Sequence, residues 1–162
     1  MKSVPVKMLL SEPQFFCWIL QALVTTAMLG VIWTVQLVLY PQFSQIGEAE
    51  FASYHAEYSS RITWIVGPLM LAELALALVG VGFFWATPLR WITLIGLLLV
   101  GVIWIVTAVV QIPVHSRLSQ GLDQIEVKSL VSGNWIRTIA WSVRAVLVWW
   151  VLIRFLGSTS AT

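Results

Sequence analysis

The chain has 162 residues, of which 59% are hydrophobic and 10% are charged, and its formal net charge is +2. This composition excludes an ordinary soluble domain and is typical of a chain that spans a membrane. The basic residues are few and scattered, which argues against nucleic acid as a partner, and the single cysteine, Cys17, excludes a multi-cysteine metal site.

Four apolar runs are long enough to cross a bilayer, because one span needs about 20 mostly apolar residues. They cover roughly residues 15–40, 62–85, 91–112 and 135–155. We therefore expect an all-α integral membrane protein, a bundle of four transmembrane helices that forms a single membrane domain over residues 1–162. The first run is longer than the core of a signal peptide, so we expect it to be retained.

A short motif divides the chain into two similar halves. The letters GVIW at residues 30–33 recur at residues 101–104, and each copy is followed by a proline, Pro41 or Pro113. We interpret the halves as repeats, from about residue 14 to 86 and from about 89 to 156. Each repeat holds two spans, so both start on the same membrane face and form parallel repeats related by an axis along the membrane normal.

Two longer connectors lie at one end of the predicted bundle. Residues 41–60 and 113–133 mix apolar and charged residues at helical spacing, a pattern typical of amphipathic helices at the membrane interface. We expect Gly121 and Gly133 to break the second connector. The turn near Pro88 is short, so the second and third spans should be antiparallel neighbours.

Each span that carries the repeated motif also has a stripe of polar and aromatic residues at i, i+3 and i+7 spacing. The stripes are Trp33, Gln36 and Tyr40, and Trp104, Thr107 and Gln111. Polar side chains in a membrane usually turn toward the bundle interior, so Gln36, Tyr40 and Gln111 are candidate substrate-binding residues. For Thr107 we favour a hydrogen bond between helices, and for both tryptophans we favour core packing.

The only histidines, His55 and His115, lie in the two connectors. They are candidate catalytic residues and candidate metal ligands, because neutral imidazole suits copper, iron, zinc and haem. Glu50 or Glu57 would add an oxygen ligand. The alternative is that both histidines are solvated or hydrogen-bonded. The sequence leaves the cofactor open among haem, copper and iron.

Glu73 and Arg144 fall within spans, where an ionisable side chain is costly and marks a functional site or a paired partner. Counted along helices, they lie at similar depths of about 18 and 13 Å from one face. We predict a buried pair, or a network that includes Gln36 and Ser142, with a catalytic or a structural role. Pro68 should kink its helix toward the interior.

The fourth span should begin at Asn134, a favourable N-cap residue. Arg137, Trp141 and Arg144 then share one helical face. This basic, aromatic stripe would bind an anionic or quinone-like ligand, with Asn134, Arg137 and Trp141 as substrate-binding residues. The alternative for Arg137 is that its side chain extends to the interface.

Two short runs resemble sequences of the anthrone oxygenase-like family of small bacterial and fungal membrane proteins. Residues 113–118 read Pro-x-His-x-Arg-Leu, and residues 134–138 read Asn-Trp-x-Arg-Thr. The likeness lies mainly in the second half of the chain. It implies oxygenation of an aromatic compound within the bundle and points to His115, Asn134 and Arg137.

These features favour a membrane oxidoreductase or oxygenase that acts on a small hydrophobic or aromatic substrate. A non-catalytic subunit or assembly factor of a larger membrane complex, and a dimeric transporter, are the alternatives, so homo-oligomers and complex partners stay open. Basic residues are balanced between the two faces. If Arg61 and Arg137 belong to the site and are left out of the count, four basic residues lie on the face of the termini and two on the opposite face. Basic residues that flank spans are more frequent on the cytoplasmic side, so we expect both termini in the cytoplasm and the protein in a bacterial inner membrane.

Overall fold

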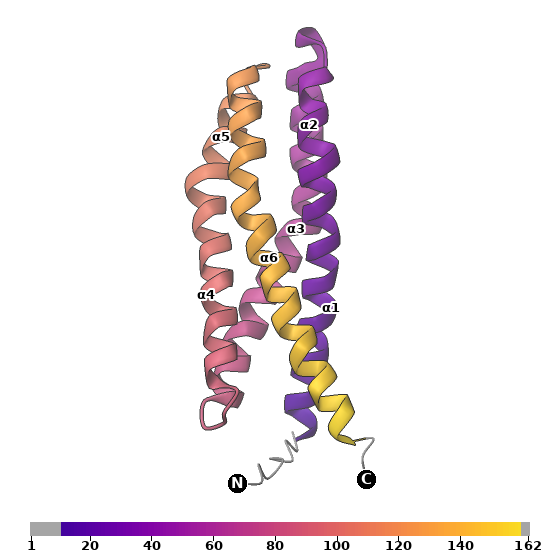
Figure 1. The fold of residues 1–162 in the computed structure, drawn as a ribbon. Coiled ribbons are helices and arrows are strands. Elements are labelled where there is room, and N and C mark those ends of the chain that lie inside the picture. Colours follow the sequence, from indigo (N-terminus) through magenta and orange to yellow (C-terminus); the bar gives the residue numbers. More distant parts are fainter. Residues whose placement is uncertain (1–10, 160–162) are drawn as a thin grey trace.

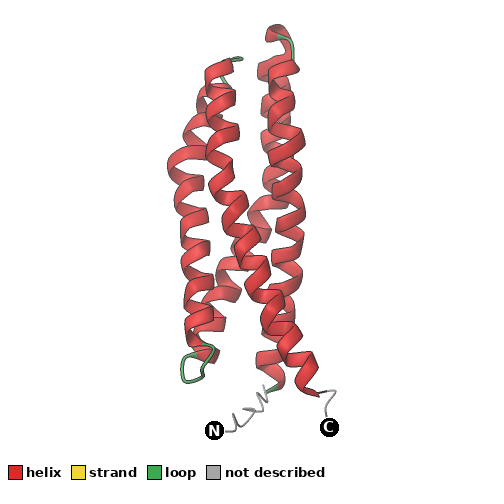
Figure 2. Ribbon diagram, in the orientation of Figure 1, coloured by secondary structure: helices red, strands yellow, loops and turns green. Residues whose placement is uncertain are grey.

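The computed structural model describes residues 11–159, with side chains to residue 156. Within this part of the chain the structure is helical without strands, and short loops join the helices (Figure 2). Four helical stretches are long and apolar enough to cross a membrane: Glu12–Gln45, Glu48–Phe84, Arg90–Leu118 and Gln124–Leu156. The protein is therefore an all-α four-helix bundle and an integral membrane protein, as the sequence predicts.

Two of the four stretches are interrupted by segments of different helical pitch. The first contains α1 (Glu12–Thr34), the π-helical segment η1 (Val35–Leu39), α2 (Tyr40–Gln42) and the 3-10 turn η2 (Phe43–Gln45). The second is α3 (Glu48–Phe84). The third contains α4 (Arg90–Val106), the π-helical segment η3 (Thr107–Gln111) and α5 (Ile112–Leu118), and the fourth is α6 (Gln124–Thr159).

The helices form a ring in which α1 packs against α3 and α6, and α4 packs against the same two helices. In Figure 1, α3 lies beside α4 near their short connection and reaches α1 and α2 at the opposite end. The turn at residues 85–89 confirms that α3 and α4 are antiparallel neighbours. We call the end with the turns at residues 46–47 and 119–123 the connector end.

Exposed tryptophans mark the membrane band on α3. Trp64 is 80% exposed and Trp85 is 61% exposed. The helical distance between their positions is about 31 Å, close to the roughly 30 Å hydrocarbon thickness of a bilayer. Within residues 11–156 the exposed charged side chains lie toward the two ends, whereas Glu73, Arg137 and Arg144 are buried. His55 precedes Trp64 by nine residues on α3 and contacts His115, so both histidines lie outside the edge of the band that Trp64 marks.

The two connectors differ from the interfacial helices that their sequences predict. α3 runs without a break from Glu48, and Asn134 and Gly133 lie inside α6, so Asn134 is not an N-cap and Gly133 is not a break. Gly121 does lie in a break, the turn that separates α5 from α6, and has a positive φ of 150°. The connector helices continue along the bundle because their apolar side chains pack on one another instead of on the membrane.

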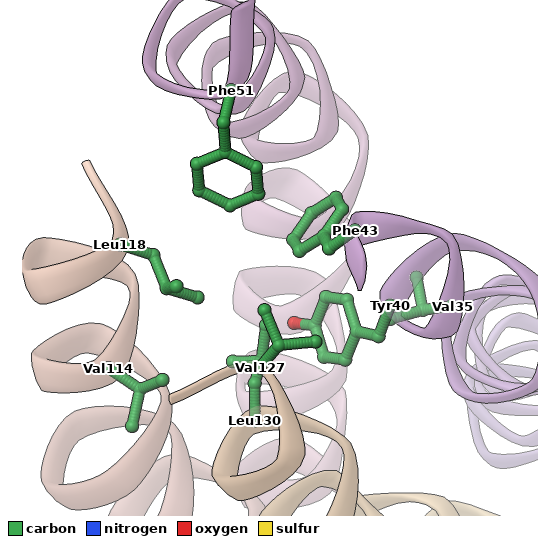
Figure 3. Packing of buried hydrophobic residues seen from close by; sticks show 8 residues of the cluster. All are labelled: Val35, Tyr40, Phe43, Phe51, Val114, Leu118, Val127 and Leu130. Atoms are coloured by element: carbon green, nitrogen blue, oxygen red, sulfur yellow. The ribbon is translucent and has the colours of Figure 1, made fainter. Parts of the chain in front are cut away.

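That packing forms a buried cluster at the connector end (Figure 3). Its members come from all four helical stretches: Val35, Tyr40, Phe43, Phe51, Val114, Leu118, Val127 and Leu130. In Figure 3 the hydroxyl oxygen of Tyr40 points into the space between the helices. The cluster closes this end of the bundle and leaves one polar atom facing inward.

Both π-helical segments end two residues before a proline of the proposed repeats. The amide of Tyr40 bonds to the carbonyl of Val35, and the amide of Ile112 bonds to the carbonyl of Thr107. Proline lacks an amide hydrogen and crowds the preceding turn, and a wider turn accommodates it. This shared feature agrees with the two-repeat interpretation, which stays a prediction.

The tryptophans of the repeated motif occupy different environments. Trp33 is 38% exposed, packs edge-to-face on Trp135 and donates a hydrogen bond to Ser142, so the prediction that it packs in the core is wrong. Trp104 is partly buried and packs against a core cluster that contains Met70. Because α1 turns Trp33 toward the membrane, the two stripes do not face each other over their whole length.

Candidate functional site

The two histidines meet at the connector end of the bundle. α3 positions His55, which is 1% exposed, and α5 positions the partly buried His115. The Nε2 atom of His55 lies 2.9 Å from the Nδ1 atom of His115, and the rings are stacked with their centroids 5.1 Å apart. The two histidines that the sequence offered as candidates are therefore in direct contact.

Tyr40 and Gln111 extend this pair into a chain of hydrogen bonds. The Tyr40 hydroxyl lies 3.1 Å from Nε2 of His115 and donates to Oε1 of Gln111 over 3.3 Å. Because a neutral imidazole has one N–H, these contacts are all satisfied when His55 donates to His115 and His115 donates to Tyr40. The Nδ1 atom of His55, which is buried without a partner, then carries no hydrogen.

Aromatic rings shield the histidine pair on the side away from the membrane. The ring of Phe51 stacks on His55 at 5.7 Å, and the ring of Phe43 meets it edge-on at 5.6 Å. Both phenylalanines are fully buried (Figure 3). The imidazoles are thus closed off at the connector end, and the open side of His115 faces the bundle interior.

A cavity of about 450 Å³ lies on that open side. α1, α3, α6 and the stretch from α4 to α5 all contribute to its wall. Its polar lining includes Tyr40, Tyr58, Ser59, Gln111, His115 and Arg137. Its apolar lining includes Met28, Ile32, Val66, Met70 and Trp104. A mostly apolar cavity with a few convergent polar groups is the usual form of a small-molecule site.

The cavity reaches the surface of the bundle that faces the membrane. Leu71 on α3 and Ile112 on α5 both line it, and their side chains are 59% and 60% exposed. Both positions are apolar and belong to membrane-spanning stretches. Leu71 lies seven residues inside Trp64 on α3, so at this position the cavity is open toward the hydrocarbon, between α3 and the α4–α5 stretch.

Arg137 is a buried cation at the polar part of this cavity. It is 5% exposed, donates from Nη1 to Oδ1 of Asn134 over 3.1 Å and lies over the ring of Trp141 at 5.2 Å. It also interacts electrostatically with Tyr40. Among residues 11–156, the ion pairs are Arg61–Glu57, Arg117–Glu126 and Arg144–Glu73. Arg137 therefore has no carboxylate partner in this part of the chain.

Asn134 and Gln36 support Arg137 on the side away from the cavity. The side-chain amide of Asn134 donates to Oε1 of Gln36 over 2.9 Å, and the amide of Gln36 donates to the carbonyl of Val131 over 3.1 Å. Neither residue lines the cavity. They are placed to orient the guanidinium group, a role distinct from the direct substrate contact predicted for them.

Glu73 and Arg144 form the predicted buried pair, with 3.3 Å between Nε of Arg144 and Oε1 of Glu73. The same carboxylate accepts hydrogen bonds from Thr25 and Trp141. Arg144 also donates to the carbonyl of Gly96 over 3.0 Å and to the side chain of Gln21 over 3.4 Å. The network joins all four helical stretches.

Gln36 and Ser142 are not part of this network, so the alternative prediction that included them is wrong. Gln36 bonds near Asn134, and Ser142 accepts a hydrogen bond from Trp33. Trp141 bonds to Glu73 and does not line the cavity, and neither do Glu73 and Arg144. The geometry of the pair thus favours a structural role, because each charged group has buried partners and no access to the cavity.

Of the predicted site residues, the cavity wall contains Tyr40, Gln111, His115 and Arg137. His55 contacts His115 but does not itself line the cavity. Tyr58 and Ser59 also line the cavity, although the sequence did not single them out. The available signal was their position three and four residues after His55, which places them on the same helical face.

The histidine pair lacks the further ligands of a dedicated metal site. Among the residues that the structure describes, no three His, Cys, Asp or Glu side chains come together. Glu57 pairs instead with Arg61 on the exposed face of α3, and Glu50 is exposed, so the predicted carboxylate ligand is absent. Two imidazoles alone do not fit the three or four protein ligands of usual zinc sites.

Thr107 bonds to its own helix, donating to the carbonyl of Ile103, so the predicted hydrogen bond between helices is wrong. It lines the cavity as well.

Comparisons with protein family models, with curated proteins and with solved structures gave no match.

Proposed function

We propose that the protein is a membrane oxidoreductase or oxygenase that acts on a small hydrophobic or aromatic substrate. The observation that carries this proposal is the cavity of about 450 Å³, at which His115, Tyr40 and Arg137 converge from three helical stretches. Its opening toward the hydrocarbon suits a substrate that partitions into the bilayer. The resemblance to the anthrone oxygenase-like family supports oxygenation as the reaction.

The polar groups suit chemistry that begins with removal of a proton. An aromatic methylene or hydroxyl group beside His115 would lose a proton to Nε2 of this imidazole, which is able to accept one when His115 instead donates from Nδ1 to His55. Arg137 would stabilise the resulting anion, since it is a fixed positive charge in a largely apolar cavity. For a methylene group, reaction with dioxygen then gives a carbonyl group and one molecule of water.

A metal- or haem-dependent reaction with His55 and His115 as ligands is the second form of the proposal. It is supported by the two adjacent imidazoles alone. Metal analysis and a visible absorption spectrum of the purified protein distinguish the two forms. Stoichiometric copper or iron, or a haem spectrum, that disappears in a His55→Ala/His115→Ala variant would establish the metal-dependent form.

The reaction is tested with protein in lipid nanodiscs and anthrone as a probe. We expect dioxygen uptake to match anthraquinone formation, and we expect the rate to fall to the uncatalysed rate in His115→Asn. Ser116→Asn, which changes an exposed neighbour on α5, is the matched control. If no aromatic methylene or phenolic probe reacts, or if a probe reacts at the same rate after both histidines are replaced, the proposed reaction fails. Co-purification with a stable partner would then favour a non-catalytic subunit.

We infer that the connector end faces away from the cytoplasm of a bacterial inner membrane. Arg61 and Arg117 at this end form ion pairs with glutamates, and Arg137 is buried. At the other end, Arg90 and Arg154 are exposed and lie over tryptophan rings. With Lys2 and Lys7, which precede the first span in the sequence, that end has four basic residues, against Arg61, Arg117 and the exposed Lys128 at the connector end. Basic residues that flank spans are more frequent on the cytoplasmic side. A cysteine introduced at Ser119 should react with a membrane-impermeant maleimide in intact cells.

A further inference from the structure

We infer that the molecule bound in the cavity carries one anionic oxygen group, which pairs with Arg137. This inference rests on the proposed binding site and is independent of the reaction that takes place there. It defines the substrate class as an apolar body with a carboxylate, phenolate or enolate at one end. Three features of the cavity lead to it.

The first feature is the uncompensated charge. Burying a cation is strongly unfavourable unless an anion pairs with it. Arg137 donates a hydrogen bond to Asn134, makes a cation–π contact with Trp141 and interacts with the hydroxyl of Tyr40, and none of these three groups is an anion. Its Nε atom is buried without a partner. Glu73, the buried carboxylate of the neighbouring network, is already bound by Arg144. An anion in the cavity would supply the missing charge.

The second feature is an excess of hydrogen-bond donors. Four buried polar atoms without a partner belong to residues of the cavity wall: Nε of Arg137, Nε2 of Gln111, the hydroxyl of Tyr58 and the hydroxyl of Ser59. All four can donate a hydrogen bond. Carboxylates are absent from the described cavity wall. A group rich in acceptor lone pairs fits this wall better than a donor such as an amine.

The third feature is the apolar remainder of the wall. Met28, Ile32, Val66 and Met70 line the cavity and carry no hydrogen-bonding group. A free inorganic anion would satisfy Arg137 but would leave this surface without contacts. An aromatic or aliphatic body attached to the anionic group would satisfy both. The combination selects an amphipathic anion.

Equilibrium binding to the protein in uncharged lipid nanodiscs tests this inference. The probes are 2-naphthoate and its neutral isostere 2-naphthamide, with decanoate and decanamide as an aliphatic pair. We expect at least one acid to bind ten times or more tightly than its amide. Tight naphthoate binding indicates an aromatic ligand, whereas preference for decanoate indicates a fatty-acid-like ligand. Absence of discrimination in both pairs, including absence of binding, overturns the inference.

Variants of Arg137 test whether its charge causes the preference for the acid over the amide. Arg137→Gln should reduce the affinity for the preferred acid at least tenfold and leave the affinity for its amide nearly unchanged. Arg137→Lys should retain part of the preference, and Arg117→Gln, an exposed position on α5, should retain all of it. An undiminished preference in Arg137→Gln would overturn the assignment. If that variant does not fold, Arg137→Lys decides, because loss of the geometry of guanidinium must weaken acid binding selectively.

The inference of an anion site and the proposal of an enzyme can be refuted independently. Selective binding of an acid without any turnover would support the anion site and count against the enzyme proposal. Turnover of anthrone by an Arg137→Gln variant at an unchanged rate would support the enzyme proposal and count against the anion site.

Discussion

The Nε2 atom of His55 and the Nδ1 atom of His115 lie 2.9 Å apart, although the two residues are 60 positions apart in the sequence. One histidine comes from each half of the chain. Tyr40 bonds to His115 from α2, so three separate helical stretches share one chain of hydrogen bonds. This chain fixes the connector end of the cavity, and its loss should be measurable as a loss of stability.

Tyr40→Phe should reduce the free energy of unfolding by about 1 to 3 kcal/mol. The change removes the hydroxyl group that bonds to both His115 and Gln111 and leaves their buried polar atoms without a partner. Equilibrium unfolding in detergent micelles measures the effect. Tyr54→Phe is the matched control, because Tyr54 is 37% exposed. Equal stability of the two variants would show that the chain does not hold the helices.

Glu73→Gln should destabilise the protein by roughly 3 to 5 kcal/mol, because it leaves the buried Arg144 without its anion. Arg144→Gln should have a similar effect. The double variant should lose less than the sum of the single losses, with an interaction energy of about 0.5 to 3 kcal/mol. A double-mutant cycle measures this difference. Additive losses would contradict a direct interaction between the two charges.

The exposed pair Arg61–Glu57 provides the comparison for this cycle. Its two side chains are 77% and 63% exposed, so solvent weakens their attraction. Glu57→Gln should change the free energy of unfolding by about 1 kcal/mol at most. A loss as large as that of Glu73→Gln would mean that burial does not account for the effect.

The sequence predicted those parts of the site that depend on the cost of polar groups in a membrane. A charged side chain within a span needs a partner at a similar depth, and Glu73 and Arg144 are such partners. The two histidines had to share one end of the bundle because both connectors lie there. Spacing along single helices could not identify Thr25 as a partner of Glu73, since that contact depends on how α1 packs against α3.

The sequence patterns could not predict that the helices extend through the connectors, or which way side chains such as Trp33 point. The amphipathic connectors suit a membrane surface as well as a partner helix, and the structure buries them against each other, as Phe51 and Leu118 show. The orientation of Trp33 depends on packing with Trp135 on α6. Both outcomes follow from tertiary contacts that a local pattern does not contain.

Gly133→Ala should reduce the free energy of unfolding by about 1 to 2 kcal/mol, which is the cost of overpacking less the gain in helix propensity. A Cβ atom at this position would lie 2.8 Å from Cγ1 of Val110 and would push α6 away from η3. Gly101→Ala is the control, since a Cβ atom there meets nothing within 4 Å. A loss of stability in Gly101→Ala alone would contradict the packing of α6 on η3.

Leu71→Trp should slow the entry of a bilayer-soluble ligand into the cavity. Leu71 lines the cavity and is 59% exposed, so a larger side chain there would obstruct the opening between α3 and the α4–α5 stretch. Stopped-flow fluorescence with 2-naphthoate in nanodiscs would measure the association rate. We expect this rate to fall several-fold, and we expect the dissociation rate to fall with it, because the same opening serves both directions.

Leu78→Trp is the matched control for this prediction. Leu78 lies on the same helix, is 54% exposed and does not line the cavity. A change in lipid packing around a tryptophan would affect both variants equally, whereas obstruction of the opening affects Leu71→Trp alone. Unchanged rates in Leu71→Trp would mean that the ligand enters elsewhere.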